Sequence, residues 1–286
     1  MENSAVLPQR AVQTHVRRNK NGTIKVGAII NKSSVVLKIL VGALLLLTVY
    51  AFWSFDYKQI KLGEAITATL HNMKTVFLEP QLSTDTMQNV LYQLLVTFCL
   101  GVLSTIFGAI LAFFCALLCA KNLAPSALAN TIKSLVALVR AVPTVLWVLI
   151  FSVSAGLGSV AAVIGLTFHS FAYLTKVYAE SIEEVDAGTL EALRASGAGF
   201  WQIVFQAILP SSISRMVAWT FMRFEINFTN AVAMGAAAGA GGIGFQLFMA
   251  GSFYFNLHEM GFLTYVVVIA VVILEFCSTK IKASVK

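Results

Sequence analysis

The chain has 286 residues, of which 58% are apolar and only 12% are charged, and its mean hydropathy is +0.82. This composition excludes a water-soluble globule, because such a chain has too little polar surface to cover a folded domain. The net charge of +7 points to nucleic acid or anionic lipid as a partner, and the placement of the charges decides between them.

Several apolar runs of about 20 residues can each cross a hydrocarbon core about 30 Å thick. We therefore predict an all-α integral membrane protein with about six transmembrane helices. The four cysteines all lie inside apolar runs and the four histidines are scattered, so we expect no disulfide, no metal site and no cofactor.

The first third of the chain alternates between polar and apolar segments. Residues 1–34 are polar and basic, and residues 35–55 form an apolar run that we predict to be the first transmembrane helix. Residues 56–88 are polar with balanced charge, which indicates an external loop that can include a short interfacial helix. Residues 89–278 then hold the remaining spans, and residues 279–286 form a basic tail.

Within that core, the second span is expected at about 90–119 and the third at about 134–155. Arg140 lies near the start of the third span, where its long side chain can reach the cytoplasm. The fourth span runs to about Tyr178 and contains His169, for which a packed neutral ring and a ligand contact are both open.

Residues 180–210 form a polar-edged helical hairpin between apolar runs. Its first helix is predicted over 180–196, and Gly197 with Gly199 permits a sharp turn after it. A second short helix then presents an aromatic face formed by Phe200, Trp201 and Phe205 together with Val204 and Ile208. Pro210 suits the first turn of the next helix, which is expected to start near Ser211. We refer to residues 180–210 as the docking loop.

The fifth helix carries polar residues at mid-membrane depth. Arg223, Glu225 and Asn227 lie 13 to 17 residues beyond Pro210, which corresponds to about 20–25 Å along a helix. Arg223 and Asn227 share one helix face, whereas Glu225 needs a partner on another helix. Charges at this depth are usually functional, but a structural ion pair within the bundle remains an equal alternative.

The same helix leads into a glycine-rich segment at 239–244 that formally matches G-x-G-x-x-G. A dinucleotide site is not expected, since no strand precedes the motif and no acidic residue follows at the required distance. Either these glycines allow close helix packing, or the helix unwinds here and exposes its backbone to a water-filled pathway. The sixth span follows at about 262–277.

The distribution of Lys and Arg predicts the orientation. With both termini inside, thirteen of these residues lie in internal segments, while the external segments hold Lys58, Lys61 and Lys74. We therefore predict that both termini and the docking loop lie in the cytoplasm. The basic N-terminus is then explained as a topology signal lying on anionic membrane lipid, and no nucleic-acid partner is expected.

The docking loop resembles the cytoplasmic loop of ABC importer permeases, whose pattern is E-A-A, three residues, Gly, nine residues, Ile, one residue, Leu-Pro. The positions in register are Glu191, Ala192, Gly197, Leu209 and Pro210. Leu193 and Ala207 depart from the pattern, although Ile208 is adjacent.

Further segments narrow the resemblance to the phosphonate ABC transporter permease family. The matching segments are RAVP at 140–143, GLG at 156–158, LTFHS at 166–170, KVYAE at 176–180, RFEIN at 223–227 and GAGGIGF at 239–245. A methionine permease group shares the loop and the glycines but is less similar elsewhere. Thr229 stands where the phosphonate group often carries an Arg, which places the substrate in question.

The resemblance implies that two copies form a pore, that each docking loop seats in a cytoplasmic ATPase subunit and that an external binding protein delivers the solute. The chain has no Walker-type motif, so it is expected to be a transport permease rather than an enzyme. A phosphorus oxyanion is expected, phosphonate first, with phosphite, phosphate or methionine as alternatives. A channel or scaffold without ATP coupling and a membrane enzyme are the other classes.

Two sets of residues are candidates for function. Those expected to couple to the ATPase are Glu191, Ala192, Gly197, Phe200, Trp201, Leu209 and Pro210. Those expected along the translocation pathway are Arg140, His169, Arg223, Glu225, Asn227, Gly239, Gly241, Gly242 and Gly244.

Overall fold

The computed structural model describes residues 17–18, 24–25, 32–54 and 61–284. Most of the predicted basic segment 1–34 therefore lies outside the described residues. The chain divides into two units, Met1–Ala65 and Ile66–Lys286. The first unit contains the two-residue strands β1 (Arg17–Arg18) and β2 (Ile24–Lys25), which pair antiparallel.

The first unit also contains α1 (Lys32–Ser54), which agrees with the helix predicted over 35–55. Its apolar side chains lie on all sides and nearly all are exposed, from Val36 to Trp53. A helix that is apolar all round suits a lipid environment. α2 (Leu62–Leu78) is the short helix expected in the segment 56–88.

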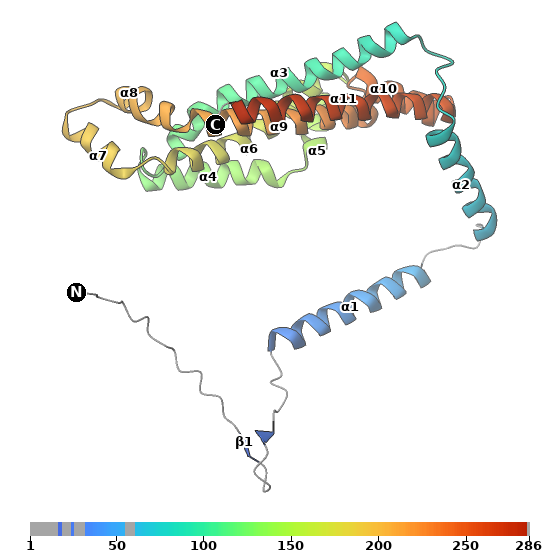
Figure 1. The fold of residues 1–286 in the computed structure, drawn as a ribbon, viewed down its shortest axis with the longest axis horizontal. Coiled ribbons are helices and arrows are strands. Elements are labelled where there is room, and N and C mark those ends of the chain that lie inside the picture. Colours follow the sequence, from blue (N-terminus) through green and yellow to red (C-terminus); the bar gives the residue numbers. More distant parts are fainter. Residues whose placement is uncertain (1–16, 19–23, 26–31, 55–60, 285–286) are drawn as a thin grey trace. The chain divides into compact units, whose positions relative to one another are not determined.

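The second unit is a helical bundle (Figure 1). Its long helices are α3 (Met87–Cys119), α6 (Ser159–Glu183), α9 (Leu209–Ala238) and α11 (Leu257–Ser284). Small residues let these helices approach closely. A Cβ added at Gly108 of α3 would lie 2.8 Å from the Cβ of Ser170 on α6, and one at Gly101 would lie 3.2 Å from the backbone of Phe228 on α9.

Four of the described helices are long and apolar enough to cross a membrane, and the number rises to six if each of two bent helix pairs counts as one span. The prediction of an all-α protein with about six spans is confirmed at this upper number. The two bent pairs differ from the straight spans that the sequence predicts.

The predicted third span, 134–155, is wrong as a single straight helix. It consists of α4 (Ser126–Ala141) and α5 (Thr144–Ala155), which are bent by 88°. Pro143 causes the break, because it cannot donate a backbone hydrogen bond and forces the preceding Val142 into an extended conformation. The indole N–H of Trp147 then donates to the carbonyl of Val139 at 3.0 Å.

The second bent pair follows the glycine-rich segment. α9 ends at Ala238, α10 (Gly242–Phe248) follows with a bend of 43°, and a π-helical turn η2 (Met249–Phe253) extends it. Gly239 adopts the left-handed conformation with φ of 59°. The freed backbone is satisfied from neighbouring helices, because Ser159 donates to the carbonyl of Ala240 at 2.7 Å and Thr97 accepts from the amide of Ile243 at 2.9 Å.

The glycines therefore combine unwinding and close packing, at different positions, while the exposure of the unwound backbone to a water-filled pathway stays a prediction. The helix unwinds at Gly239–Gly241, whereas Gly244 provides close packing, since an added Cβ there would overlap the carbonyl of Val232. The local structure is unwound backbone that is buried in protein, which a membrane environment permits.

The helices of the docking loop differ from the predicted boundaries. α6 continues to Glu183, and the short helix is α7 (Ala187–Ala195) rather than 180–196. The expected second short helix is also wrong as a separate element. α8 (Phe200–Ile203), a π-helical turn η1 (Val204–Ile208) and α9 follow one another without interruption. The wider π-helical turn accommodates Pro210, whose missing N–H cannot join an α-helical ladder.

The sixth helix, α11, is longer than the predicted 262–277. Glu259 in its first turn is 3% exposed. It accepts hydrogen bonds from the amide of Asp85 at 2.8 Å and the side chain of Asn256 at 2.9 Å. Because these partners satisfy the carboxylate, Glu259 can be buried in the first turn, and the helix begins before the predicted residue 262.

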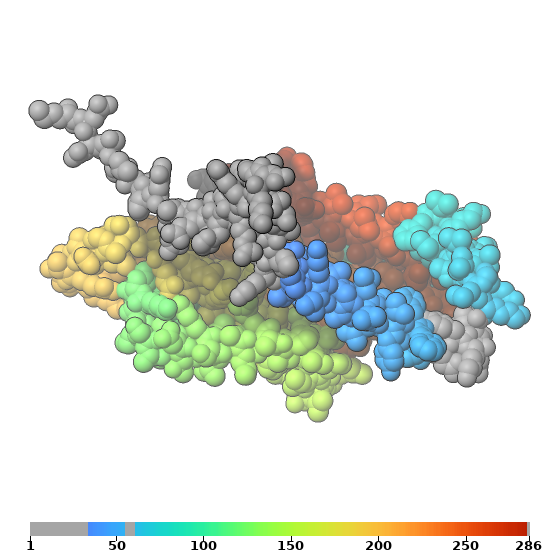
Figure 2. All heavy atoms as spheres, turned by 90° about the horizontal axis from the view of Figure 1, so that it is seen from below, coloured from blue at the N-terminus to red at the C-terminus, as the bar shows by residue number. Residues whose placement is uncertain are grey.

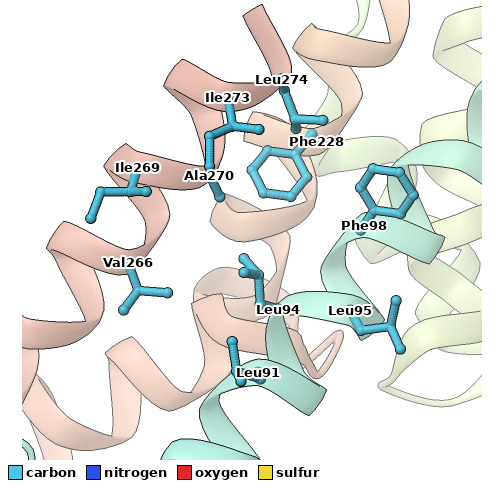
Figure 3. Close-up of a pocket in the computed structure, with 10 residues that line it drawn as sticks. All are labelled: Leu91, Leu94, Leu95, Phe98, Phe228, Val266, Ile269, Ala270, Ile273 and Leu274. Atoms are coloured by element: carbon cyan, nitrogen blue, oxygen red, sulfur yellow. The ribbon is translucent and has the colours of Figure 1, made fainter. Parts of the chain in front are cut away.

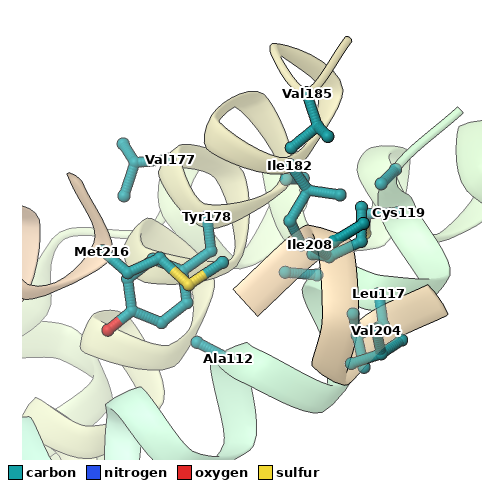
Figure 4. Close-up of a cluster of buried hydrophobic side chains, with 14 of the residues drawn as sticks. Ala112, Leu117, Cys119, Val177, Tyr178, Ile182, Val185, Val204, Ile208 and Met216 are labelled. Atoms are coloured by element: carbon teal, nitrogen blue, oxygen red, sulfur yellow. The ribbon is translucent and has the colours of Figure 1, made fainter. Parts of the chain in front are cut away.

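A hydrophobic core lies at the docking-loop end of the bundle, where α3, α6 and the start of α9 meet (Figure 4). Ile182 of α6, Leu190 of α7 and Ile208 of η1 are at most 2% exposed in this core. Tyr178 lies in the same core and its hydroxyl bonds to Thr220 at 2.5 Å. The docking loop is therefore anchored to the bundle by its aliphatic side chains.

Candidate functional site

The middle of the bundle contains a buried arginine. Arg223 of α9 is 2% exposed. Its Nε donates to the hydroxyl of Ser170 at 3.0 Å, and Nη2 lies 2.8 Å from Nδ1 of His169. The guanidinium also stands 5.3 Å from the centre of the Tyr173 ring, a distance typical of a cation–π contact. Three residues of α6 thus hold one residue of α9.

Asn227, one turn further along α9, extends this network to a third helix. Its Nδ2 donates to the hydroxyls of Thr105 on α3 and Ser170 on α6, each at 2.8 Å. Asn227 and Ser170 are fully buried and Thr105 is 3% exposed. We call Arg223, His169, Ser170, Asn227 and Thr105 the Arg223 cluster.

The hydrogen bonds fix the proton on the histidine ring. A guanidinium only donates, so Nδ1 of His169 accepts, and the ring proton is carried by Nε2 when the imidazole is neutral. His169 is half-buried. Its second nitrogen, Nε2, is therefore a donor that remains available to a ligand.

Arg223 forms no ion pair with any residue that the structure describes. The nearest candidate in sequence, Glu225, is paired instead with Lys282 of α11 at 3.0 Å. Glu225 thus has its partner on another helix, as its position on the helix requires, and it does not neutralise Arg223. A buried cation with only neutral partners is costly, and in membrane segments such residues are mostly functional.

The other candidate pathway residues lie elsewhere. Arg140 is half-buried near the end of α4, in a pocket of about 250 Å³ that Lys176 of α6 also lines. Gly239, Gly241, Gly242 and Gly244 lie at the break between α9 and α10. That break is 12 or more residues beyond Asn227, or about 18 Å along a helix. The predicted pathway residues therefore occupy four places and not one site, namely the Arg223 cluster, the Glu225–Lys282 pair, the pocket at Arg140 and the break between α9 and α10.

Sequence reasoning missed Ser170, Thr105 and Tyr173 as members or neighbours of the cluster. Tyr173 lies four residues after His169, so the shared helix face could have indicated it. Thr105 lies between Gly101 and Gly108, and this small-residue pattern marks the close approach of α3 to the other helices.

The base of the docking loop is fixed by hydrogen bonds. Arg215 of α9 pairs with Glu184 at 2.9 Å, and Arg194 of α7 donates to the carbonyl of Asn122 at 2.5 Å. Asp186 caps α7 by accepting from the amide of Thr189 at 2.8 Å. This hydrogen bond lowers the pKa of Asp186 below its ordinary value.

The tip of the docking loop leaves aromatic rings exposed. Phe200, Trp201 and Phe205 are 42%, 52% and 59% exposed. Trp201 stacks on Phe205 with ring centres 6.0 Å apart. Val204 and Ile208 are instead fully buried, so the single face predicted for Phe200, Val204 and Ile208 is wrong. The π-helical turn interrupts the spacing of four and separates a buried aliphatic face from an exposed aromatic one.

The remaining candidate coupling residues lie in the same loop. Glu191, Ala192, Gly197 and Pro210 are exposed, and Leu209 is half-buried. Gly197 has φ of 80° and open space around it. Figure 2 shows the docking loop in yellow at the end of the second unit where α4, in green, begins.

An open groove of about 610 Å³ lies between α3 and α11, with Phe228 of α9 at its floor (Figure 3). All ten side chains that line it are apolar, among them Leu91, Phe98 and Ile269. Such a surface offers no hydrogen bond to a charged solute. The groove is therefore not the solute site, and it matches apolar chains or helices.

Comparisons with known proteins agree with this description. Residues 108–283 match the family described as binding-protein-dependent transport system inner membrane component. The phosphate-import permease protein PhnE of Mycolicibacterium smegmatis is 35% identical over 153 residues, which cover 53% of this chain and 29% of that protein. The phosphite transport system permease protein PtxC of Stutzerimonas stutzeri is 34% identical over 152 residues, covering 53% of this chain and 55% of that protein.

Among solved structures, the inward-facing MetNI methionine ABC transporter has a chain with a TM-score of 0.64 and 24% identity, covering 72% of this chain and 100% of that one. This similarity concerns the fold. The match to PhnE and PtxC spans about half the length of those relatives or less. Because the family match extends over well more than half of the 286 residues, the chain belongs to the inner membrane component family of binding-protein-dependent transport systems.

Proposed function

We propose that this chain is the permease subunit of an ATP-driven importer for a small phosphorus oxyanion, phosphonate first, with phosphite and phosphate as alternatives. The similarity to permeases named for phosphate and phosphite supports the class of solute. The observation that carries the proposal is the buried guanidinium of Arg223, which has no carboxylate partner among the described residues.

The chemistry of the Arg223 cluster suits a tetrahedral oxyanion. A guanidinium presents a fork of N–H donors that matches two oxygens of one phosphorus centre. His169 adds a donor at Nε2 when Nδ1 accepts from Arg223. An anion at this position supplies the counter-charge that the bundle itself lacks.

Access to Arg223 requires motion, because its side chain is only 2% exposed. Tyr173 and His169 of α6 cover the guanidinium, so a solute reaches it when α6 and α9 separate there. Importers alternate between conformations. If α6 and α9 separate in only one of them, the anion contacts Arg223 in that conformation and is released in the other.

The exposed aromatic tip supports the second part of the proposal. Three rings on a rigid, hydrogen-bonded base form the kind of surface that an apolar groove of a partner recognises. We assign this tip to a cytoplasmic ATPase subunit, with two copies of the permease forming the pore and an external binding protein delivering the solute. ATP turnover then takes place in the partner.

The orientation of the chain can be tested separately. A single cysteine near Lys74 should react with an impermeant reagent from outside intact cells, and one near Arg194 only after permeabilisation. The reverse pattern would place the docking loop outside and exclude the assignment to a cytoplasmic partner.

The solute is decided by two linked measurements. Calorimetry on the cognate binding protein should show tight binding of a phosphonate or phosphite and none of methionine. The complex in proteoliposomes should then take up the same anion with ATP present. Preference of the binding protein for methionine or another amino acid would show that the solute assignment is wrong.

A further inference from the structure

Members of one stripe of residues on α4 and of one stripe on α6 line a pocket between the two helices. On α6, the residues His169, Tyr173, Lys176 and Glu180 recur at spacings of four and three, so they share one helix face. On α4, Ala137 and Arg140 recur in the same way, one turn and more beyond Lys133. The pocket of about 250 Å³ lies between these stripes, and we call it the α4–α6 pocket.

Two of the three cations of the pocket are paired. Lys133 contacts Glu183 at 2.7 Å, and the same carboxylate accepts from the amide of Lys121 at 2.8 Å. Lys176 lies 3.6 Å from Glu180, a long and partly exposed pair. Exposed pairs of this kind contribute little and separate readily.

The third cation is Arg140. Its guanidinium makes no hydrogen bond or ion pair to another residue in the described part of the chain, although the residue is half-buried. The pocket therefore holds three cations and two carboxylates among its lining residues, and the surplus positive charge resides on the guanidinium.

The size of the pocket also fits a small anion. One water molecule occupies about 30 Å³ in the liquid. A pocket of about 250 Å³ therefore accommodates a five-atom tetrahedral oxyanion together with several waters. The ammonium of Lys176 on α6 and the guanidinium of Arg140 on α4 line it, so donors come from both helices. The Thr175 hydroxyl already donates to the carbonyl of Phe171 at 2.8 Å.

The location connects the pocket to the Arg223 cluster. Lys176 lies seven residues after His169 on the same face of α6, which is about 10 Å along the helix. His169 is itself bonded to Arg223. Along α6, the contact with Arg223 at His169 is therefore followed by Lys176, which lines the pocket together with Arg140, toward the end of the bundle that carries the docking loop.

We propose that the α4–α6 pocket is a second binding site for a phosphate-type oxyanion, held by Arg140 and Lys176. This inference deepens the proposed function by adding a second binding site for the anion. Its substrate class rests on that proposed function. The head group of an anionic phospholipid presents the same chemistry, and such groups bind basic pockets between membrane helices.

The test measures the charge preference of the pocket. Ala137 lines the pocket and is exposed, so the full-length chain with Ala137→Cys, and with its four native cysteines replaced, is purified in detergent. Thiosulfonate reagents of equal size and opposite charge are then compared. We expect the anionic reagent to react on the order of tenfold faster than the cationic one, because the surplus charge is positive.

Arg140→Gln should abolish most of this preference, whereas Arg140→Lys should retain it. Lys280→Gln removes one positive charge from the exposed end of α11 and is the matched control, with no expected effect. Inorganic phosphate should slow modification of the wild-type pocket, and chloride at equal ionic strength should not. Equal rates for both reagents, together with no protection by phosphate, would overturn the proposal.

Vesicles distinguish the two sources of the anion. Protection by inorganic phosphate in phosphatidylcholine vesicles identifies a free oxyanion as the ligand. Protection in vesicles that contain phosphatidylglycerol, without added phosphate, identifies a lipid head group. Either result supports the site. Since modification is measured without transport, failed uptake bears on the proposed function alone, and lost charge preference bears on this site alone.

Discussion

The Arg223 cluster and the docking loop both hold side chains in an environment that is unusual for their residue type. The cluster holds a guanidinium inside an apolar bundle, whereas the loop exposes three aromatic rings. The cluster satisfies its hydrogen bonds internally but leaves a charge unbalanced. The loop buries its aliphatic face and leaves the aromatic one uncovered. The cluster therefore lacks a counter-charge, and the loop lacks a partner surface for its aromatic face.

This difference predicts how the two regions respond to mutation. Changes to exposed rings should affect association with a partner and leave the bundle intact. Changes inside the cluster should affect stability when they remove a hydrogen-bonding hub, and solute passage when they remove the charge.

The largest effect is expected from Trp201→Ala combined with Phe205→Ala. Buried aromatic anchors at interfaces contribute about 2 kcal/mol or more each, so the affinity for the ATPase subunit should fall at least about 30-fold per ring. The thermal midpoint of the permease alone should not change, because both rings are exposed. Co-purification and a binding titration check this result.

The matched control for the aromatic pair is Val204→Ala, which lies on the buried face of the same segment. It should destabilise the permease by about 2 kcal/mol, while the rings still bind the partner. Unaltered ATPase binding by the double aromatic variant would show that the exposed face is not the contact surface.

The next effect concerns the hub of the Arg223 cluster. Asn227→Leu removes the amide that donates to the hydroxyl oxygens of Thr105 and Ser170, so two buried hydrogen bonds between helices are lost. We expect a loss of about 1–3 kcal/mol in unfolding free energy. Thermal unfolding in detergent measures it, with Thr229→Val as control, because Thr229 is exposed and its change should cost less than about 0.5 kcal/mol. Equal midpoints for both variants would contradict the role of Asn227.

A smaller effect is expected at the turn of the docking loop. Gly197 has φ of 80°, so Gly197→Leu places a side chain in left-handed backbone, at a cost of about 1–2 kcal/mol. Membrane insertion should be normal, but transport per ATP hydrolysed should fall as the loop tip is displaced. Gly199→Ala is the control, since Gly199 has φ of −73°. Full coupling in Gly197→Leu would show that the turn geometry is not required.

The smallest effect is the pH dependence of α7. The amide of Thr189 stabilises the Asp186 carboxylate and lowers its pKa below 3.8. A lowered pKa means that the cap stabilises α7 fully at neutral pH and is lost only as pH falls through that lowered value. Limited proteolysis of α7 as the pH is lowered from about 6 to about 2 should show this loss at the acid end, and Asp186→Asn should remove the pH dependence.

Much of the fold could be predicted from the sequence because, in a chain of this composition, a long apolar run forms a membrane-spanning helix. Local breaks were harder to predict. Pro143 and Gly239 are visible as breakers, but whether a helix kinks, ends or re-enters depends on the partners available to the freed backbone groups, such as Trp147 and Ser159. The π-helical turn before Pro210 has no comparable signal in a single sequence.

The candidate site could be predicted only in part for a related reason. Arg223, Asn227 and His169 were identifiable as polar residues in apolar helices. Their grouping, and the pairing of Glu225 with Lys282, depend on which helices pack together. That packing is determined by small residues such as Gly108, whose effect is seen only when the neighbouring helix is in place.

The central claim is that Arg223 contacts the anion during transport, and Arg223→Gln tests it most directly. In proteoliposomes with the ATPase and the binding protein, this variant should lower phosphonate-stimulated ATP turnover and uptake at least about tenfold, since a charge-assisted donor pair is lost. Glu225→Gln, which alters a neighbouring charge already paired with Lys282, should leave uptake within about twofold. Unchanged uptake by Arg223→Gln in a stable, fully assembled complex would contradict the account.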